Sequence, residues 1–386
     1  MNVPKIRFNG FEEEWQENKL CDIARITMGQ SPNSENYTND SNDTLLIQGN
    51  ADLNNGKVIP RLFTKQVTKT CDKNDIIMTV RAPVGDIAIS DYNACIGRGV
   101  CSIKSSKFVY HYLDYLKMKD YWKKISKGST IDSITSDDIK SLLIKTPNKK
   151  EEKKIIKTID LINKKIELQS KKIEDLKLFK KGLINKVINE LTFYKKIELS
   201  ELGVTYTGLT GKTKEDFENG ESHYIPFVDI LNNKINIDIL PLVNIKKNEI
   251  QNKVRKYDLF FNTSSETANE VGLCTTLNFD IENTYLNSFC FGYRINDVNK
   301  INNEYLNILL HSNIYRKKIS ILGQGFTRVN ISKNKLMKIK VLIPSYKKQL
   351  EIVDVINIEN NKILLEESKL YKLQKLKKGL MQNMFV

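Results

Sequence analysis

Apolar residues recur every three to four positions along two long stretches of the chain. The first stretch begins after Pro147 and contains no further proline and a single glycine, Gly182. The second stretch begins after Pro344 and runs to the end of the sequence. This spacing predicts two long helices, each with one apolar stripe between charged residues. About 39 residues at 1.5 Å each give a helix of roughly 58 Å.

Neither helix is expected to stand alone in water, because its apolar stripe would remain exposed. If the second helix packs on the first within one chain, it must run back toward the first globular part, so the pair is antiparallel. In the alternative, each helix pairs with another chain. Glu359 and Glu366 interrupt the second stripe. The positions expected to pair the helices are Ile155, Ile159, Ile162, Ile166, Leu176, Leu183, Ile352, Ile356, Ile363, Leu373 and Leu380.

The two helical stretches belong to an internal repeat. LKLFKKGLINKVI at 176–188 aligns with LQKLKKGLMQNMF at 373–385, at a shift of 197 residues. Further upstream, YLDYLKMKDYWKKIS from Tyr112 resembles YLNILLHSNIYRKKIS from Tyr305, and LCDIARITMGQ from Leu20 resembles LSELGVTYTGL from Leu199. A register held over this length indicates a duplicated unit. The middle parts of the two copies match poorly.

Each copy begins with a globular part that is rich in short apolar or alternating runs. In the first copy these runs are TLLIQG, KVIPRLF, DIIMTVRA, GDIAIS and GVCSIK, bounded by Gly, Asn, Asp or Pro, which is the pattern of strands and turns. We therefore predict mixed α/β globules with mostly antiparallel sheets. The predicted boundaries are a first globular domain at 1–146, a first helix at 147–190, a second globular domain at 191–343 and a second helix at 344–386.

Charge and composition favour a polyanionic partner. The formal net charge is +15 and the pI is about 9.2. Lysine dominates, as an AT-rich coding bias would also produce, but all nine arginines lie outside the two helical stretches. Arg can bind guanine through two hydrogen bonds, whereas Lys acts mainly as a point charge on phosphate. If bases are read, the globular parts are expected to read them.

No catalytic pattern is found in the sequence. TGLTGKT at 207–213 departs from a phosphate-binding loop because Tyr206 stands where that loop requires glycine. The motifs of an adenine-amino methyltransferase are absent, and the six cysteines form no C-x-x-C pair. The three histidines lack partners at ligand or triad spacing. We expect a non-catalytic, cytoplasmic chain without a membrane span.

Taken in order, these stretches resemble the specificity subunit of type I restriction-modification systems. The resemblance covers the whole chain and rests on PKIRFNGFEEEW, GRGVCSIK, the GST segment at 128–130, Pro147 before the helix, KKGL near its end, and a second copy with GQGFTR ending at Arg328. Ile131 stands in the first copy where Arg328 stands in the second.

The resemblance implies two target-recognition domains, each reading one half of a bipartite site in double-stranded DNA. It implies that the antiparallel helices set the spacing and dock two methyltransferase subunits through the helical positions named above. The methyltransferase subunits would then hold S-adenosylmethionine. ATP and Mg would be bound by partner subunits, including restriction/translocase subunits. This chain would hold no cofactor. The alternatives are a DNA-modifying enzyme and a coiled-coil scaffold without DNA-reading activity.

Polar and basic residues in the predicted loops are the candidates for DNA contact. Base-reading side chains are commonly carried on loops of a rigid scaffold. In the first domain they are Gln30, Ser31, Arg61, Lys65, Arg81 and Arg98, and in the second they are Thr210, Lys212, Thr213, Asn262, Arg294 and Arg328.

Overall fold

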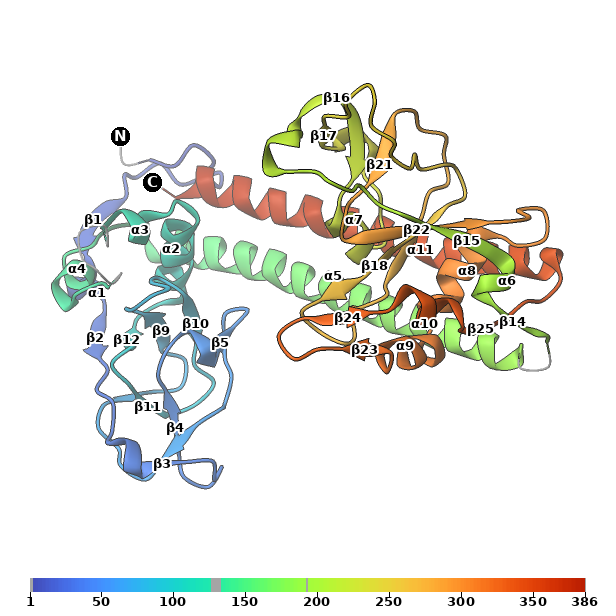
Figure 1. Cartoon of the computed structure of the whole chain (residues 1–386). Coiled ribbons are helices and arrows are strands. Elements are labelled where there is room, and N and C mark those ends of the chain that lie inside the picture. The colour runs from blue at the N-terminus through green and yellow to red at the C-terminus, as the bar shows by residue number, and fades with distance from the viewer. Residues whose placement is uncertain (1–2, 126–132, 192–193, 386) are drawn as a thin grey trace. The chain divides into compact units, whose positions relative to one another are not determined.

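The computed structural model describes residues 3–125, 133–191 and 194–385. These residues fall into two compact units: the first comprises Met1–Ser170 and Ser368–Val386, and the second comprises Lys171–Glu367. Each unit contains a mixed α/β globular part and a piece of each of two long helices (Figure 1). The predicted fold class is thereby confirmed. Ile131 and the GST segment at 128–130 lie outside the described residues.

The globular part of the first unit is built on two sheets. Strand β9 is central in the larger sheet, and all four of its residues are buried, as expected for an apolar run with neighbours on both sides. The six-stranded sheet has the order β2 (Arg25–Met28), β12 (Val100–Lys104), β9 (Ile76–Thr79), β10 (Ile87–Ile89), β6 (Lys57–Val58) and β5 (Leu53–Asn54). The five-stranded sheet has the order β3 (Tyr37–Thr38), β7 (Phe63–Thr64), β4 (Thr44–Ile47), β11 (Ala94–Ile96) and β8 (Thr70–Cys71).

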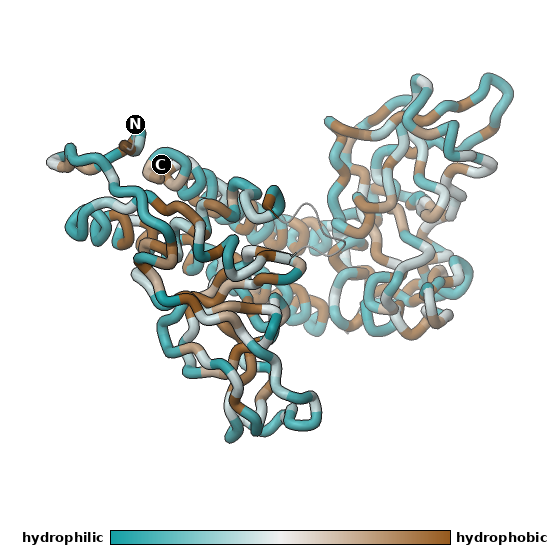
Figure 2. The backbone as a smooth tube through the Cα atoms, turned by 90° about the vertical axis from the view of Figure 1, so that its left-hand side faces the viewer, coloured by the Kyte–Doolittle hydropathy of each residue, from teal (hydrophilic) through white to brown (hydrophobic). Residues whose placement is uncertain are grey.

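Most strand pairs in the first unit are antiparallel, as predicted, although β10–β6 and β11–β4 are parallel. Strand β1 (Gln16–Lys19) pairs with β13 (Leu143–Thr146), so the beginning and the end of the globular part are joined. The short helices are η1 (Ser34–Asn36), η2 (Asn50–Asp52), α1 (Leu20–Ile23), α2 (Lys107–Met118), α3 (Tyr121–Ile125) and α4 (Ser136–Lys140). Figure 2 shows brown hydrophobic segments inside each globular part, whereas the outer loops are mostly teal.

The second unit repeats this plan with different middle elements. Strand β14 (Lys196–Glu198) pairs with β25 (Lys340–Leu342), as β1 pairs with β13. Three further sheets are described. The four-stranded sheet has the order β15 (Gly203–Thr207), β22 (Cys290–Ile295), β18 (Leu259–Asn262) and β20 (Cys274–Thr276). The two three-stranded sheets have the orders β17 (Leu242–Val243), β16 (Phe217–Ile225), β21 (Thr284–Leu286) and β19 (Ser264–Ser265), β24 (Val329–Ile331), β23 (Gly323–Gln324). The helices are α6 (Leu199–Leu202), η3 (Lys214–Asp216), α7 (Phe227–Leu231), η4 (Ile237–Ile239), α8 (Asn303–Leu310), α9 (Asn313–Ser320) and α10 (Lys333–Met337).

The two long helices are α5 (Lys149–Glu190) and α11 (Tyr346–Met384). Their pairing within the chain is antiparallel. In the second unit, Lys172 contacts Glu366 at 3.0 Å, and further along α5 Lys180 contacts Asn360 at 3.0 Å. Because residue numbers rise along one helix as they fall along the other, the helices run in opposite directions. In the first unit, Ile155 of α5 shares a hydrophobic core with Met384 of α11.

The end of α11 completes the core of the first globular part. Phe385 contacts Phe108, Tyr112 and Tyr115, with ring centroids 5.3 to 5.6 Å apart. The beginning of α5 is fixed in the same unit by Arg7, whose guanidinium donates to Glu151 at 2.8 and 2.9 Å. Residues from three distant parts of the sequence therefore fold as one core.

The predicted pairing positions lie mostly between the helices and the globular cores. Ile155, Ile159, Ile162, Ile352, Ile356 and Ile363 are buried, and Ile166, Leu176, Leu183, Leu373 and Leu380 are half-buried. The two glutamates that interrupt the second stripe are also buried, and both have basic partners: Glu359 contacts Lys362 at 2.7 Å, and Glu366 contacts Lys172. Among the residues described, no helix is long and apolar enough to span a membrane.

Candidate nucleic-acid interface

Three loops of the first unit meet just after the ends of strands β2, β4 and β11, and we call residues 29–31, 48–49 and 97–99 the first loop cluster. Backbone hydrogen bonds hold it together: Gly29 N to Val100 O (3.0 Å), Gln30 N to Ile96 O (2.8 Å) and Gly97 N to Ile47 O (2.8 Å). The loops approach too closely for side chains, because a Cβ on Gly29 would lie 2.1 Å from the Gly97 oxygen. This packing fixes the backbone on which Arg98 is carried.

Three of the predicted DNA contacts come together in this cluster. The Ser31 hydroxyl accepts a hydrogen bond from the Arg98 backbone N–H at 3.0 Å, and Gln30 precedes Ser31. The side chains of Arg98 and Gln30 are exposed. Because the turn that carries Arg98 is braced by Ser31, the guanidinium projects from a rigid base, as base-reading side chains require.

The other three candidates of the first unit lie in separate loops. Arg61 donates to the Ala51 carbonyl at 2.9 Å and lies 3.8 Å from Asp52. Lys65 is exposed after β7, and exposed Arg81 follows β9, where its backbone bridges to Ser133. Their exposure suits phosphate contact, which does not demand convergence on a single point.

The second unit has a corresponding cluster, residues 208–210, 226–227 and 287–289, which we call the second loop cluster. The same backbone frame recurs: Gly208 N to Cys290 O (3.3 Å), Leu209 N to Leu286 O (2.8 Å) and Asn287 N to Ile225 O (3.1 Å). A Cβ on Gly208 would lie 2.1 Å from the Asn287 oxygen, as at Gly29. Thr210 of this cluster exchanges two hydrogen bonds with Gln251, at 3.1 and 2.8 Å. The two frames match, whereas the side chains they carry differ.

Four predicted contacts of the second unit are engaged within the protein instead. Arg294 donates to Asp258 at 2.9 and 2.7 Å, and these hydrogen bonds raise the pKa of Arg294. Asp258 is buried and also accepts from Tyr206 at 2.6 Å. Asn262 is fully buried and donates to the Glu270 carbonyl at 3.0 Å. Arg294 and Asn262 therefore support the fold.

Lys212 is the third engaged residue. Its side chain is only 3% exposed and donates to Glu249 and to the Asn244 carbonyl, both at 2.5 Å. The hydrogen bond from Lys212, assisted by one from Gln251, lowers the pKa of Glu249 to about 2. Neighbouring Thr213 donates to Glu215 at 2.8 Å. The TGLTGKT stretch is thus a loop braced by its own ion pair, and Thr210 and Arg328 are the predicted contacts left to reach a ligand.

Several residues of the candidate interface were missed from the sequence. Gln48 lies in the first loop cluster, and its amide nitrogen is buried with no hydrogen-bond partner among the described residues. Phe289 is 57% exposed in the second loop cluster, at the place that Gly99 occupies in the first. The one sequence signal for Gln48 is its position near the end of the predicted strand TLLIQG, where the chain enters a loop. A cavity of about 330 Å³ adjoins the second loop cluster, lined by Phe227, Leu231, Ser264, Ser265, Glu266, Glu270, Phe289 and Arg328.

A second kind of surface lies on the long helices. Three pairs of exposed apolar side chains on these helices are separated by the repeat shift of 197 residues. Leu168 and Leu365 are 58% and 63% exposed. The other two pairs are Leu161 with Ile358 and Phe179 with Leu376. These exposed positions are accessible to a partner protein, whereas the positions predicted from the sequence are buried or half-buried. Among the described residues, no group of three or more His, Cys, Asp or Glu could hold a metal ion.

Comparison with known proteins agrees with this duplicated plan. Over 181 residues the chain is 36% identical to a protein of Methanocaldococcus jannaschii named putative type I restriction enzyme MjaX specificity subunit, which covers 45% of this chain and 42% of that protein. It is 27% identical over 193 residues to the type I restriction enzyme MjaIX specificity subunit of the same organism, covering 45% and 44%. The match spans less than half the length of either relative.

Solved structures share the fold. One is the S subunit of a type I restriction-modification system from M. genitalium, with a TM-score of 0.58, 18% identity and coverage of 100% of this chain and 99% of that one. Another comes from a study of complex assembly in the type I R-M system, with a TM-score of 0.63, 14% identity and coverage of 98% and 99%. The family described as Type I restriction modification DNA specificity domain matches residues 12–178 and 193–375. The chain therefore belongs to this family and carries two copies of its domain.

Proposed function

We propose that this chain is the DNA-reading subunit of a type I restriction-modification complex and that each globular domain reads one half of a bipartite site. The observation that carries the proposal is the pair of loop clusters, which share one backbone frame and carry different side chains. Arg98 stands in the first cluster where Ser288 stands in the second, and Gly99 where Phe289 stands. Two equivalent backbone frames that carry different side chains are suited to a site whose two halves differ in sequence.

The side chains of the first loop cluster fit major-groove recognition. An exposed arginine can bind O6 and N7 of guanine, and an exposed glutamine can bind N6 and N7 of adenine. Arg98 and Gln30 are exposed and carried on braced backbone. Lys65 and Arg81 would contact phosphates, which adds affinity without sequence information. Arg98 is thus the principal specificity residue proposed for the first half-site.

The long helices would set the distance between the half-sites and bind the catalytic partners. Half-sites read from one face of a duplex lie about 34–36 Å apart or at a multiple of that distance. The repeated exposed pairs on α5 and α11 suit two copies of one partner, because each copy would meet the same side chains. These partners would be two methyltransferase subunits, which hold S-adenosylmethionine. Restriction/translocase subunits of the same complex would bind ATP and Mg. The complex would act in the cytoplasm. Methyl transfer and cleavage would belong to the partners.

Methylation mapping tests this function. DNA is sequenced for modified adenine from cells that carry this chain with its methyltransferase and from cells in which only this chain is deleted. The expected result is a bipartite, asymmetric methylated motif that disappears on deletion. A methylation pattern that persists without the chain would leave the scaffold alternative in its place.

A further inference from the structure

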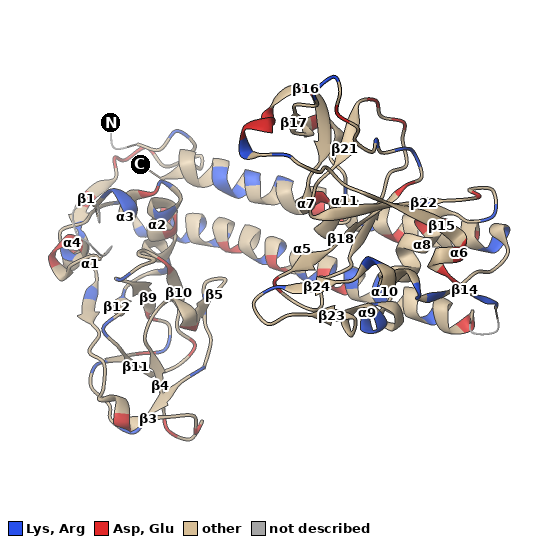
Figure 3. Cartoon of the chain, in the orientation of Figure 1, with Lys and Arg blue, Asp and Glu red and all other residues tan. Residues whose placement is uncertain are grey.

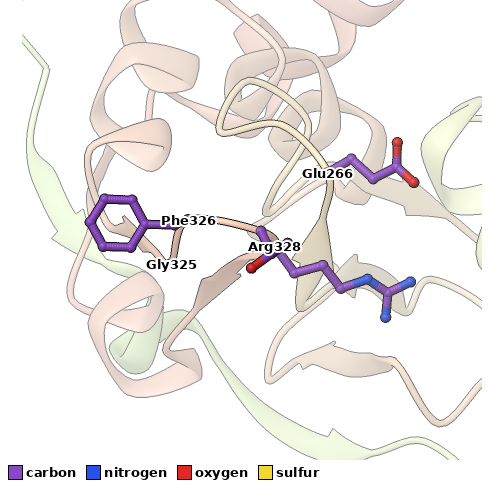
Figure 4. A pocket seen from close by; sticks show the side chains of 5 residues that line it. Glu266, Gly325, Phe326 and Arg328 are labelled. Atoms are coloured by element: carbon purple, nitrogen blue, oxygen red, sulfur yellow. The ribbon is translucent and has the colours of Figure 1, made fainter.

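The hairpin formed by β23 and β24 in the second unit presents a single aromatic side chain to solvent. Phe326 sits at its tip and is fully exposed. Gly325 has φ +122°, and a Cβ there would lie 2.1 Å from the Arg328 oxygen, so the tight tip requires glycine at this position. In Figure 4 the Phe326 ring points away from Arg328 and Glu266, which line the same surface hollow. The Phe326 ring is therefore not part of a hydrophobic core of this chain.

The hairpin is joined to the second loop cluster through backbone hydrogen bonds. Ile331 N–H donates to the Thr263 carbonyl at 2.9 Å, and Thr263 N–H donates to the Phe289 carbonyl at 3.1 Å. Arg316 braces the neighbouring loop by donating to the carbonyls of Asn269, Val271 and Gly272 at 2.7 to 2.9 Å. Phe326 is therefore carried on a supported strand pair that continues the proposed DNA surface.

The surroundings of the hairpin are basic. Between Tyr305 and Leu350 the sequence contains ten Lys or Arg and no Asp or Glu. Lys317 and Lys318 on α9 and Lys335 on α10 are exposed, and these two helices precede and follow the hairpin in the sequence (Figure 3). Two acidic residues lie near the hairpin: Glu266 lines the hollow, and both Glu266 and Glu270 line the cavity beside the second loop cluster, where Glu270 accepts from Ser265 at 2.7 Å. A polyanion matches this segment better than an acidic or apolar protein surface does.

We propose that Phe326 is a wedge that enters the minor groove and inserts between two base pairs beside the second half-site, while Arg328 and the flanking lysines hold the phosphates. Apolar side chains used in this way unstack one base step and kink the duplex. The inference rests on the proposed function and adds a local DNA deformation to it. It concerns the second unit, because the corresponding segment of the first copy carries Ile131 in place of Arg328 and includes five aspartates between Tyr112 and Lys150.

The test uses the full chain assembled with its methyltransferase on a duplex that carries the methylated motif found by sequencing. 2-Aminopurine placed at successive steps beside the second half-site reports unstacking by its fluorescence. The expected result is a fluorescence gain at one step with the unaltered chain, lost with Phe326→Ala, together with an affinity about tenfold lower. Ile321→Ala is the matched control, since Ile321 is 81% exposed but lies before the hairpin, and it should leave both readouts unchanged.

The salt dependence separates the two parts of the proposal. Arg328→Ala should lower the slope of log affinity against log salt concentration by about one, whereas Phe326→Ala should leave that slope unchanged. If Phe326→Ala weakens methyltransferase assembly and spares DNA unstacking, the tip is a protein contact and the wedge is refuted. If no step brightens with the unaltered chain on DNA that it binds, the wedge is refuted and the proposed function stands. If that chain with its methyltransferase binds no duplex, both fail together.

Discussion

At the scale of single residues, the candidate interface depends on where a loop side chain finds a partner. Arg98 and Gln30 were recognisable from the sequence as basic or polar residues of predicted loops, and the structure leaves both exposed. Arg294 was not separable from them by sequence, because its partner Asp258 is 36 residues away and meets it only when β18 and β22 pair. Lys212 and its partner Glu249 are related in the same way. Whether an arginine or lysine stays exposed thus depends on whether the fold brings an acidic side chain from a distant part of the sequence next to it.

The half-buried His311 gives the second unit a predictable response to pH. Burial, with a smaller contribution from the charges of Arg316 and Lys180, lowers the pKa of His311 to about 4. An unfolded chain binds this proton below about pH 6.5, whereas the folded chain resists it until about pH 4, so stability falls as the pH drops between these values. His311→Gln removes this titration and should flatten the dependence by up to ~3 kcal/mol over that range.

Urea unfolding of the unaltered chain and of His311→Gln, at a series of pH values from 7 to 4, measures this effect. His223→Gln is the control, because His223 is half-buried in the same unit. Equal pH dependence in the unaltered chain and in His311→Gln would contradict the account of His311.

At the scale of elements, the long helices were the most predictable feature and their surfaces the least. Spacing alone indicated both helices, because an apolar stripe every three to four residues is a local property. Which residues remain exposed depends on the partner helix and on the globular cores, so spacing alone did not identify Leu168 and Leu365, which lie outside the predicted stripe, as exposed surface positions. The burial of Glu366 was equally unpredictable from spacing, because its partner Lys172 lies on the other helix.

The repeated exposed pairs predict how many partners bind. Leu168→Glu or Leu365→Glu should each reduce the methyltransferase copies bound from two to one, because a charge would be buried in one of two equivalent contacts. The double variant should bind neither copy. Leu178→Glu is the matched control, since Leu178 is 71% exposed but its repeat counterpart is Lys375. Native mass spectrometry of the assembled complex counts the copies, and two copies retained by the double variant would contradict this docking surface.

At the scale of the whole molecule, the repeat in the sequence foretold two globular domains and two helices. It did not reveal that Phe385, at the end of the second helix, completes the core of the first unit. That contact joins residues more than 250 positions apart, and hydrophobic pattern carries no information on such distances. The middle parts of the two copies diverge, and the loop clusters they build differ in side chains on a common frame. The molecule thus combines a repeated backbone frame with different side chains in its two loop clusters.

The most direct test of this account replaces residues 20–146 by the corresponding segment of another family member and maps the methylated motif. Because each unit folds around its own core and carries its own loop cluster, one half of the bipartite motif should change, and the other half and the spacer between them should stay the same. A motif that changes in both halves, or in neither, would contradict the assignment of one half-site to each domain.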